Sequence, residues 1–203
     1  TYPAETQTAP AAAQIRSLEA TSGSTTARLG YQLDSRQAYH FQRLVRLTIM
    51  RHGKAVFDTD LKPDVNNETL GEELHKNTLQ VVDLRGDGEP EVLVTVFTGG
   101  AHCCYMTTVY GHDPLGNRYT PITQDWMDDM PKLKRLGHGP ALSFVGVDPF
   151  SYKFASFADS GFPIRIWRYE PVKLNDVTRC YPDLIRADTV SYTHLRAHET
   201  GRN

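Results

Sequence analysis

The sequence lacks long apolar runs, carries little net charge and contains few cysteines. Its 203 residues include 15 glycines and 12 prolines, which interrupt almost every stretch, and no run approaches the ~18 to 20 apolar residues that a membrane-spanning helix requires. The 22 Lys and Arg residues against 24 Asp and Glu residues give a net charge of -2, which leaves no basic field for a nucleic acid. An aromatic content of 10% is ample for a buried core and argues against wholesale disorder. We therefore expect a globular protein that neither spans a membrane nor binds nucleic acid.

Residues 1–24 are rich in Ala, Thr, Ser and Pro and hold almost no large apolar side chains. Such a segment buries too little surface to offset the entropy lost on ordering, which predicts a flexible leader or linker. A leader without an initiator Met suits a chain cut after a secretion signal, and it suits an incomplete gene equally well. We favour export, which places the protein outside the cell or in its envelope.

The other end of the sequence predicts a non-native tail over residues 189–203. Thr189 to Thr200 reads TVSYTHLRAHET and resembles the translation of a sequencing adapter read through in frame, so the natural chain is expected to be cut near Asp188. His194 and His198 stand four apart, a spacing typical of zinc ligands on one helix face. Because both belong to the tail, we reject that zinc site.

Apolar and polar residues alternate over most of the remaining chain. Ala27, Leu29 and Tyr31 share one face of such a stretch, and Arg51-His52-Gly53-Lys54 between two apolar runs predicts a hairpin. Residues 62–76 are expected to form a loop with at most a short helix, and residues 183–188 a helix behind Pro182. Further strands are expected at residues 79–82, 91–97, 105–110, 118–122, 141–147, 152–157, 163–169 and 172–174.

Short strands at this spacing, separated by Gly-, Asp-, Asn- and Pro-bearing turns, predict a mainly β fold with little helix. We expect antiparallel meander sheets, arranged as propeller blades or as an open sandwich. An internal echo favours blades, because residues 82–92 (VDLRGDGEPEV) are weakly matched about 50 residues later by residues 133–142 (LKRLGHGPAL). Residues 25–188 are thus expected to form one β-repeat domain, with two degenerate blade-like units in residues 79–188.

The segment from Asp83 to Glu91 (DLRGDGEPE) gathers the carboxylates best placed to bind a metal ion. Carboxylates spaced around a glycine bend can aim several oxygens at one point, as calcium requires. Asp83, Asp87 and Glu91 would occupy loop positions one, five and nine, and Glu89 would supply its carbonyl at position seven. Arg85 offers an alternative without an ion, because its guanidinium could bridge Asp83 and Asp87.

This loop, the following Val92-Leu93-Val94 and the string from Thr98 to Cys104 (TGGAHCC) resemble the FG-GAP or VCBS-type repeat proteins of secreted bacterial chains. A later segment, SGFPIRIWRY, is similar to the same group, so the resemblance runs from Leu79 to Asp188. It implies a calcium-stiffened β repeat of the integrin-propeller type, used for scaffolding or recognition rather than for a reaction.

The sequence departs from that family in both loops. Arg85 stands where the family carries Asp or Asn, which removes a ligand and adds a positive charge. The second loop has no carboxylate and has Lys134, Arg135 and His138 in its region. Calcium is therefore expected at no loop but the first, and there the Arg85 bridge is slightly favoured over the ion.

Three cysteines, Cys103, Cys104 and Cys180, leave one thiol over if a disulfide forms. Adjacent residues have Cα atoms ~3.8 Å apart, closer than most disulfides allow. We expect, in this order, a disulfide through Cys180, a vicinal pair, or three buried thiols. A soft-metal or redox site at His102, Cys103 and Cys104 is the functional alternative.

Catalytic motifs are weak in this sequence. It has no G-x-S-x-G elbow and no glycine-rich phosphate loop. Asp125, Asp128 and Asp129 around Trp126 would allow a glycosidase carboxylate pair, although a solvated acidic turn beside an anchoring Trp is the simpler interpretation. Six aromatic residues could stack on sugars but are more often core. They are Tyr152, Phe154, Phe157, Phe162, Trp167 and Tyr169.

Together these patterns predict a non-enzymatic, secreted or cell-envelope module with a structural or ligand-recognition role. Its partner would be an extracellular protein or a glycan. The alternative function, from a different class, is a hydrolase that acts on envelope glycans.

Overall fold

The structure is a computed structural model of the whole chain. It describes residues 15–34, 41–61, 78–97, 104–113, 116, 118–148, 156, 160–171 and 173–190. Several expectations fall outside these ranges: the loop at 62–76, the site at His102 and Cys103, the aromatic residues Tyr152, Phe154 and Phe157, and the histidine pair at 194 and 198.

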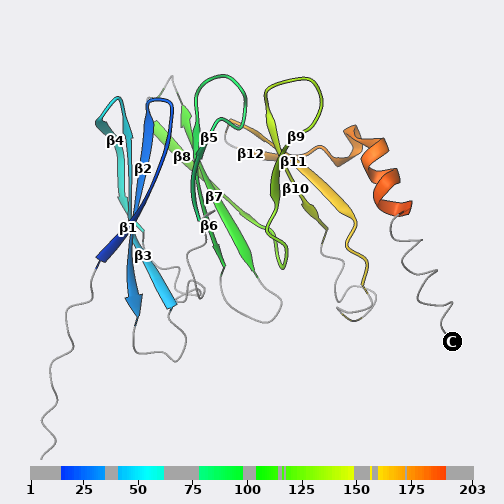
Figure 1. Cartoon of the computed structure of the whole chain (residues 1–203), viewed down its shortest axis with the longest axis horizontal. Helices are drawn as coiled ribbons and strands as arrows, with labels where there is room; N and C mark the ends of the chain where they lie inside the picture. Colours follow the sequence, from blue (N-terminus) through cyan, green and yellow to red (C-terminus); the bar gives the residue numbers. More distant parts are fainter. Residues whose placement is uncertain are drawn as a thin grey trace, which may run out of the picture.

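The described residues form three four-stranded antiparallel sheets, so the expected mainly β, meander architecture is confirmed (Figure 1). Strands that follow one another in sequence are neighbours in each sheet. The first sheet contains β1 (Ile15–Ser22), β2 (Thr25–Asp34), β3 (Phe41–Arg51) and β4 (Lys54–Asp60). The second contains β5 (Leu79–Val82), β6 (Glu91–Phe97), β7 (Tyr105–Asp113) and β8 (Arg118–Asp125). The third contains β9 (Lys132–Arg135), β10 (Leu142–Val147), β11 (Ile164–Glu170) and β12 (Lys173–Asp176).

The second sheet lies between the other two and is packed on both faces (Figure 1). In β6, Val92 and Val94 belong to the core shared with the first sheet, whereas Leu93 belongs to the core shared with the third. Successive side chains on a strand point to opposite faces, so a strand packed on both faces reads as a continuous apolar run. This is why residues 91–95 are all buried.

Each of the two cores is built from side chains of two sheets. The first core contains Ala27, Leu29, Leu44, Leu47, Ile49, Leu79, Val92, Val94, Tyr110 and Tyr119. The second core contains Leu84, Leu93, Val109, Trp126, Phe144, Trp167 and Tyr169. Trp167 and Tyr169 are therefore core residues, as the simpler interpretation of the aromatic residues predicted.

The hairpin predicted at Arg51-His52-Gly53-Lys54 joins β3 to β4, with Arg51 paired to Lys54. His52 and Gly53 both have positive φ, 48° and 74°. Two central residues with positive φ are the signature of the type I′ turn that suits the twist of a two-residue hairpin.

The flexible leader expected over residues 1–24 is wrong for Ile15–Ser22, which form β1. This strand pairs with β2 along its whole length, from Ile15 with Gln32 to Ser22 with Thr25. Of the apolar side chains of β1, Leu18 and Ala20 pack against the core. Two such residues give only a weak alternating pattern in the sequence, and the strand was therefore not predicted. Backbone pairing with β2 over its whole length adds to these two contacts in holding β1 in the sheet.

A helical segment at residues 182–190 follows η1 (Thr178–Cys180). It begins at Pro182, whose missing N–H is not needed in the first helical turn. Asp188 ties the helix to the third sheet, because its Oδ2 accepts a hydrogen bond of 2.9 Å from the backbone N–H of Ile164. The helix continues through residues 189 and 190, past the point where the tail was expected to interrupt it. The adapter origin of the tail stays a prediction.

Candidate functional site

The loop between β5 and β6 is folded around the carboxylate of Asp83. One oxygen of Asp83 accepts backbone N–H bonds from Gly86 (2.6 Å) and Asp87 (3.2 Å), and the other accepts one from Gly88 (2.8 Å). Gly86 and Gly88 have φ of 72° and 85°, a region that residues with a Cβ seldom occupy. The glycine bends predicted from the sequence therefore aim amide groups, not further carboxylates, at Asp83.

Arg85 bridges two carboxylates, but not the pair that the sequence suggested. Its Nε lies 2.9 Å from Oε1 of Glu91, and its Nη1 lies 3.2 Å from Oδ2 of Asp87. The expected partner Asp83 is instead engaged by the three backbone amides. The sequence predicted that Arg85 would bridge Asp83 and Asp87. The structure corrects one of the two partners, because Arg85 contacts Glu91 instead of Asp83.

Glu91 is fully buried at the start of β6. Its second oxygen, Oε2, accepts a hydrogen bond of 2.9 Å from the backbone N–H of Leu84. Burial raises the pKa of Glu91 to about 7, because desolvation penalises the charged form more than the Leu84 amide and Arg85 favour it. Near neutral pH this carboxyl is balanced between its two protonation states.

Glu89 points away from this group of side chains. Its Oε2 pairs with Nη2 of Arg51, and it lies 3.7 Å from Nδ1 of His112. Arg51 belongs to the first sheet, so Glu89 links the loop to that sheet rather than to Asp83. The four residues proposed for calcium thus have three different sets of partners: backbone amides for Asp83, Arg85 for Asp87 and Glu91, and Arg51 for Glu89. Among the described residues, no group of three or more His, Cys, Asp or Glu is placed to hold a metal ion.

The loop also docks on the third sheet. The backbone N–H of Leu142 donates a 2.8 Å hydrogen bond to the carbonyl of Leu84, whose side chain is fully buried in the second core. A Cβ at Gly86 would stand 2.5 Å from Cγ of Pro140. Pro140 lies in the loop between β9 and β10, the first two strands of the third sheet. Gly86 lies in the corresponding loop between β5 and β6 of the second sheet. The two loops that resemble each other in sequence therefore have equivalent places in consecutive sheets and contact each other.

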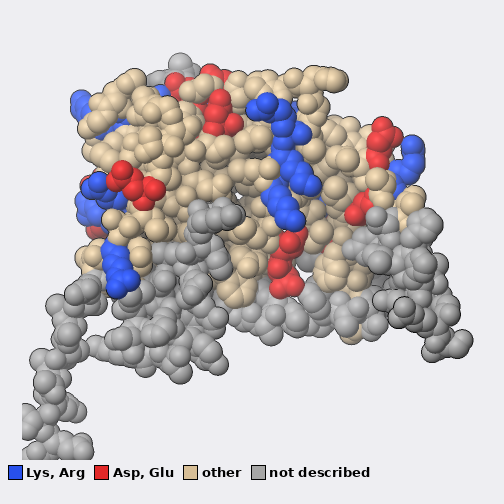
Figure 2. All heavy atoms as spheres, viewed as in Figure 1, with Lys and Arg blue, Asp and Glu red and all other residues tan. Residues whose placement is uncertain are grey.

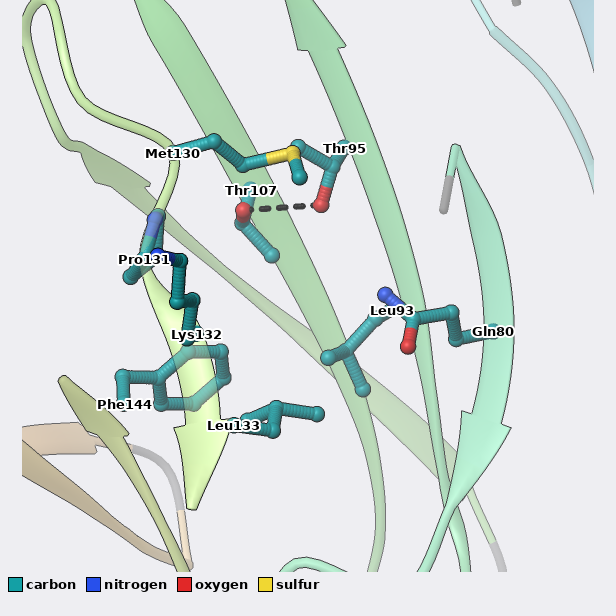
Figure 3. A pocket seen from close by; sticks show the side chains of 9 residues that line it. All are labelled: Gln80, Leu93, Thr95, Thr107, Met130, Pro131, Lys132, Leu133 and Phe144. Atoms are coloured by element: carbon teal, nitrogen blue, oxygen red, sulfur yellow. Dashed lines mark hydrogen bonds between the residues drawn. The ribbon is translucent and has the colours of Figure 1, made fainter. Parts of the chain in front are cut away.

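A cleft of about 270 Å³ lies elsewhere in the interface between the second and third sheets (Figure 3). It is lined by Gln80, Leu93, Thr95, Thr107, Met130, Pro131, Lys132, Leu133 and Phe144. The hydroxyl oxygens of Thr95 and Thr107 lie 2.9 Å apart at one end, and Leu133 and Phe144 lie away from them (Figure 3). Sequence analysis missed this cleft. The available signal was Thr95, a polar residue within the buried run of β6 and directly opposite Thr107 in β7.

Trp126 anchors the wall of this interface. Its ring stacks on Phe144 with centroids 5.2 Å apart and meets Trp167 edge-on at 4.9 Å. Its indole N–H donates a 2.8 Å hydrogen bond to the hydroxyl of Thr107, which satisfies the one polar group of this buried side chain. The neighbouring Asp125 accepts a 2.7 Å bond from the backbone N–H of Met127, a local turn contact.

The cysteines depart from the first expectation. Cys180 is an exposed, free thiol, so neither a disulfide through Cys180 nor a set of three buried thiols describes the chain. Cys104 is not free, and Cys103 lies outside the described residues. A vicinal pair therefore stays a prediction.

Comparison with known proteins gives one informative match. The chain is 31% identical over 103 residues to a probable thylakoid lumen protein of Synechocystis sp., an alignment that covers 49% of this chain and 30% of that protein. The chain thus spans less than a third of the length of this relative. No family model and no solved structure matches. Within the described ranges, no helix is both long and apolar enough to cross a membrane.

Proposed function

We propose that this chain is a non-catalytic β-repeat module of a secreted or cell-envelope compartment, with a structural or ligand-recognition role. The observation that carries the proposal is the contact between Arg85 and Glu91, which closes the loop of the second sheet with a cation from the chain itself. A loop closed in this way needs no metal to hold its two flanking strands. The relative that is a probable lumen protein supports an exported location.

The proposal extends to the FG-GAP or VCBS-type resemblance. Three consecutive four-stranded meanders with echoing loops in the second and third are the arrangement that a blade-like repeat protein would have. Within this proposal, the positive charge of Arg85 takes the place of the calcium ion that the loop of the family would bind. The chemistry is a guanidinium bonded to two carboxylates, and charge-assisted bonds of this kind are among the stronger polar contacts in proteins.

The alternative of a glycan hydrolase has less to support it. Asp125 makes a turn contact with the N–H of Met127, which is a structural use of that carboxylate. A screen of envelope glycans that compares the wild-type chain with Asp125→Asn and Asp128→Asn variants is expected to give no turnover. Carboxylate-dependent turnover would replace the module by an enzyme.

Calcium titration followed by thermal unfolding tests the proposed module. A ligand that binds only the folded state must raise the unfolding midpoint by mass action, so the wild-type chain is expected to show no shift in millimolar calcium. An Arg85→Asp variant restores the acidic loop position and is expected to gain a calcium-dependent rise. Arg85→Asn supplies an oxygen ligand without adding a fourth carboxylate to Asp83, Asp87 and Glu91, and it serves if Arg85→Asp does not fold.

Arg28→Asn is the matched control, because Arg28 also pairs with a carboxylate, Glu19, but on the exposed edge of the first sheet. It should respond to calcium no more than the wild type does. A calcium-dependent rise in the wild-type midpoint would overturn the proposal that Arg85 replaces the ion.

A further inference from the structure

We infer that the cleft between the second and third sheets binds a small organic carboxylate. The carboxylate would lie near the Thr95–Thr107 hydroxyl pair and Lys132, and the hydrocarbon part would lie against Leu133 and Phe144. This inference rests on the recognition role proposed above and names the class of ligand.

The hydroxyl pair has one proton more than its own contacts use. Thr107 is 1% exposed and Thr95 is 7% exposed. Two hydroxyl groups carry two protons, and the single bond between them uses one, whichever oxygen is the donor. Trp126 adds a third proton to the set, and it is already directed at the Thr107 oxygen. One hydroxyl proton therefore remains without an acceptor among the described residues, and a ligand oxygen in the cleft would accept it.

Positive charge gathers beside the cleft on the edge strand β9. Lys132, Lys134 and Arg135 are exposed, and Figure 2 shows basic side chains following this strand down the face of the molecule. Within the described part of the chain, none of the three forms an ion pair, whereas Arg28, Arg46, Arg85 and Arg165 all do. Lysine on an edge strand also discourages pairing with other sheets. Protection of the edge would account for all three residues equally. Only Lys132 lines the cleft, so a role in binding concerns Lys132 and not Lys134 or Arg135.

Asp129 is an acidic side chain that interacts electrostatically with Lys132. Burial raises the pKa of Asp129, and the charge of Lys132 opposes that rise. The two side chains do not form an ion pair. The ammonium group of Lys132 is therefore available to a ligand carboxylate.

The size and shape of the cleft limit the ligand. Sites for drug-sized molecules are ~300–1,000 Å³, and this cleft of about 270 Å³ lies just below that range. Its walls combine apolar side chains with the amide of Gln80, which points into the space in Figure 3. A short aliphatic or aromatic acid fits this combination, because it offers one hydrophobic body and one anionic end.

Titration with hexanoate, followed by tryptophan fluorescence and by the indole N–H signal of Trp126 in NMR spectra, tests this inference. Trp126 bonds directly to Thr107, so occupation of the hydroxyl end should shift that signal saturably. Hexanamide, which has the same length without the charge, should bind about tenfold more weakly, since a hydrogen bond to a charged group is worth roughly twice one to a neutral group.

The variants separate the cleft from general surface charge. Lys132→Gln and Thr95→Val are each expected to weaken hexanoate binding about tenfold. Thr95→Ser, which keeps the hydroxyl, should retain affinity and excludes misfolding as the cause of the loss. Lys134→Gln is the matched control, because Lys134 is exposed on the same strand but does not line the cleft, and its effect should stay within about twofold because exposed charges are screened.

Failure to observe saturable binding, equal affinity for hexanamide, or equal losses in Lys132→Gln and Lys134→Gln would each overturn the inference. The first of these results would mean that the cleft holds only water. None of them alters the calcium response of the unfolding midpoint, so a failure of this inference is distinguishable from a failure of the proposed metal-independent module.

Discussion

The Nε atom of Arg85 lies 2.9 Å from Oε1 of Glu91, a carboxylate that has no exposed surface. Both residues come from the same hairpin, six positions apart, and the Leu84 amide holds the other oxygen of Glu91. A buried carboxylate is stable only when it is paired or protonated. This pair therefore couples the conformation of the loop to the protonation of Glu91 and to the presence of Arg85.

Replacement of Arg85 by Met removes the cation while it keeps most of the side-chain volume. Removal of one partner of a buried ion pair leaves the other uncompensated, and the free energy of unfolding is expected to fall by about 3 kcal/mol. Urea unfolding at about pH 9, where Glu91 is ionised because the pH lies well above its pKa of about 7, measures this loss. The control is Arg28→Met, which breaks an exposed pair with Glu19 and should change stability by less than about 1 kcal/mol. Equal losses in the two variants would show that the Arg85 pair is no more important than a surface contact.

Stability should depend on pH through Glu91. Its pKa is about 7 in the folded chain against an ordinary value of 4.5, so the folded state binds more protons than the unfolded state between these values. Protonated Glu91 therefore contributes to the free energy of unfolding in full below about pH 4.5, and this contribution is lost as the pH rises through about 7. The loss is about 3 kcal/mol, the free-energy equivalent of the shift in pKa.

The measurement compares wild type and Glu91→Gln by urea unfolding at a series of pH values. The other titrating groups cancel in the difference between the two profiles. Wild type should lose stability relative to Glu91→Gln as pH rises from about 4 to about 8. Parallel profiles would contradict the raised pKa.

Gly86→Ala and Gly88→Ala should differ although both glycines have positive φ. A Cβ at Gly88 meets nothing within 4 Å, whereas a Cβ at Gly86 would stand 2.5 Å from Cγ and 2.6 Å from Cβ of Pro140. Gly88→Ala is expected to cost about 1 kcal/mol for the backbone alone. Gly86→Ala adds a steric cost of about 1–3 kcal/mol, so thermal unfolding should rank it clearly below Gly88→Ala. The same midpoint for both variants would argue against docking of the loop on Pro140.

Gly111 should also be intolerant of a side chain, because β7 passes close to a side chain of the third sheet. A Cβ at Gly111 would overlap the hydroxyl oxygen of Tyr169 and lie 2.8 Å from its Cζ. Gly111→Ala is expected to lower the free energy of unfolding by about 1–3 kcal/mol, and a Tyr169→Phe change in that background should recover part of the loss.

Gly146→Ala provides the control for Gly111→Ala. Gly146 is a strand glycine in the third sheet, and a Cβ there would make ordinary contacts of 3.5 Å with Pro131 and 3.6 Å with Trp167. It should therefore cost much less. A Gly146→Ala variant as unstable as Gly111→Ala would indicate a general effect of glycine in strands instead of this one close approach.

Local patterning was sufficient to predict most strands. The alternation around Leu29 and the paired turn residues His52 and Gly53 act within a few residues, so the sequence displays them directly. The same method missed β1, because Leu18 and Ala20 contribute little apolar surface and the strand depends on β2 for its hydrogen bonds. The loop was recognised as a place where carboxylates need a positive partner, which Arg85 supplies.

The partners within the loop could not be read from spacing. Asp83 is nearer to Arg85 in sequence than Glu91 is, yet the positive φ values of Gly86 and Gly88 turn three amides toward Asp83 and leave Arg85 to Glu91. The cleft was equally hidden, since its walls come from residues as far apart as Gln80 and Phe144.

By itself, the order of residues determined most of the extended segments, where the chain turns between them, and that the segment from Asp83 to Glu91 carries excess negative charge beside one arginine. These are consequences of backbone preference and side-chain periodicity, which act over short distances along the chain. Only the stacking of the sheets decided that Glu91 is buried, that Gly86 and Gly111 admit no side chain, and that Thr95, Thr107 and Lys132 border one cleft. Burial and close approach depend on residues brought together from distant parts of the chain, and no local pattern encodes them.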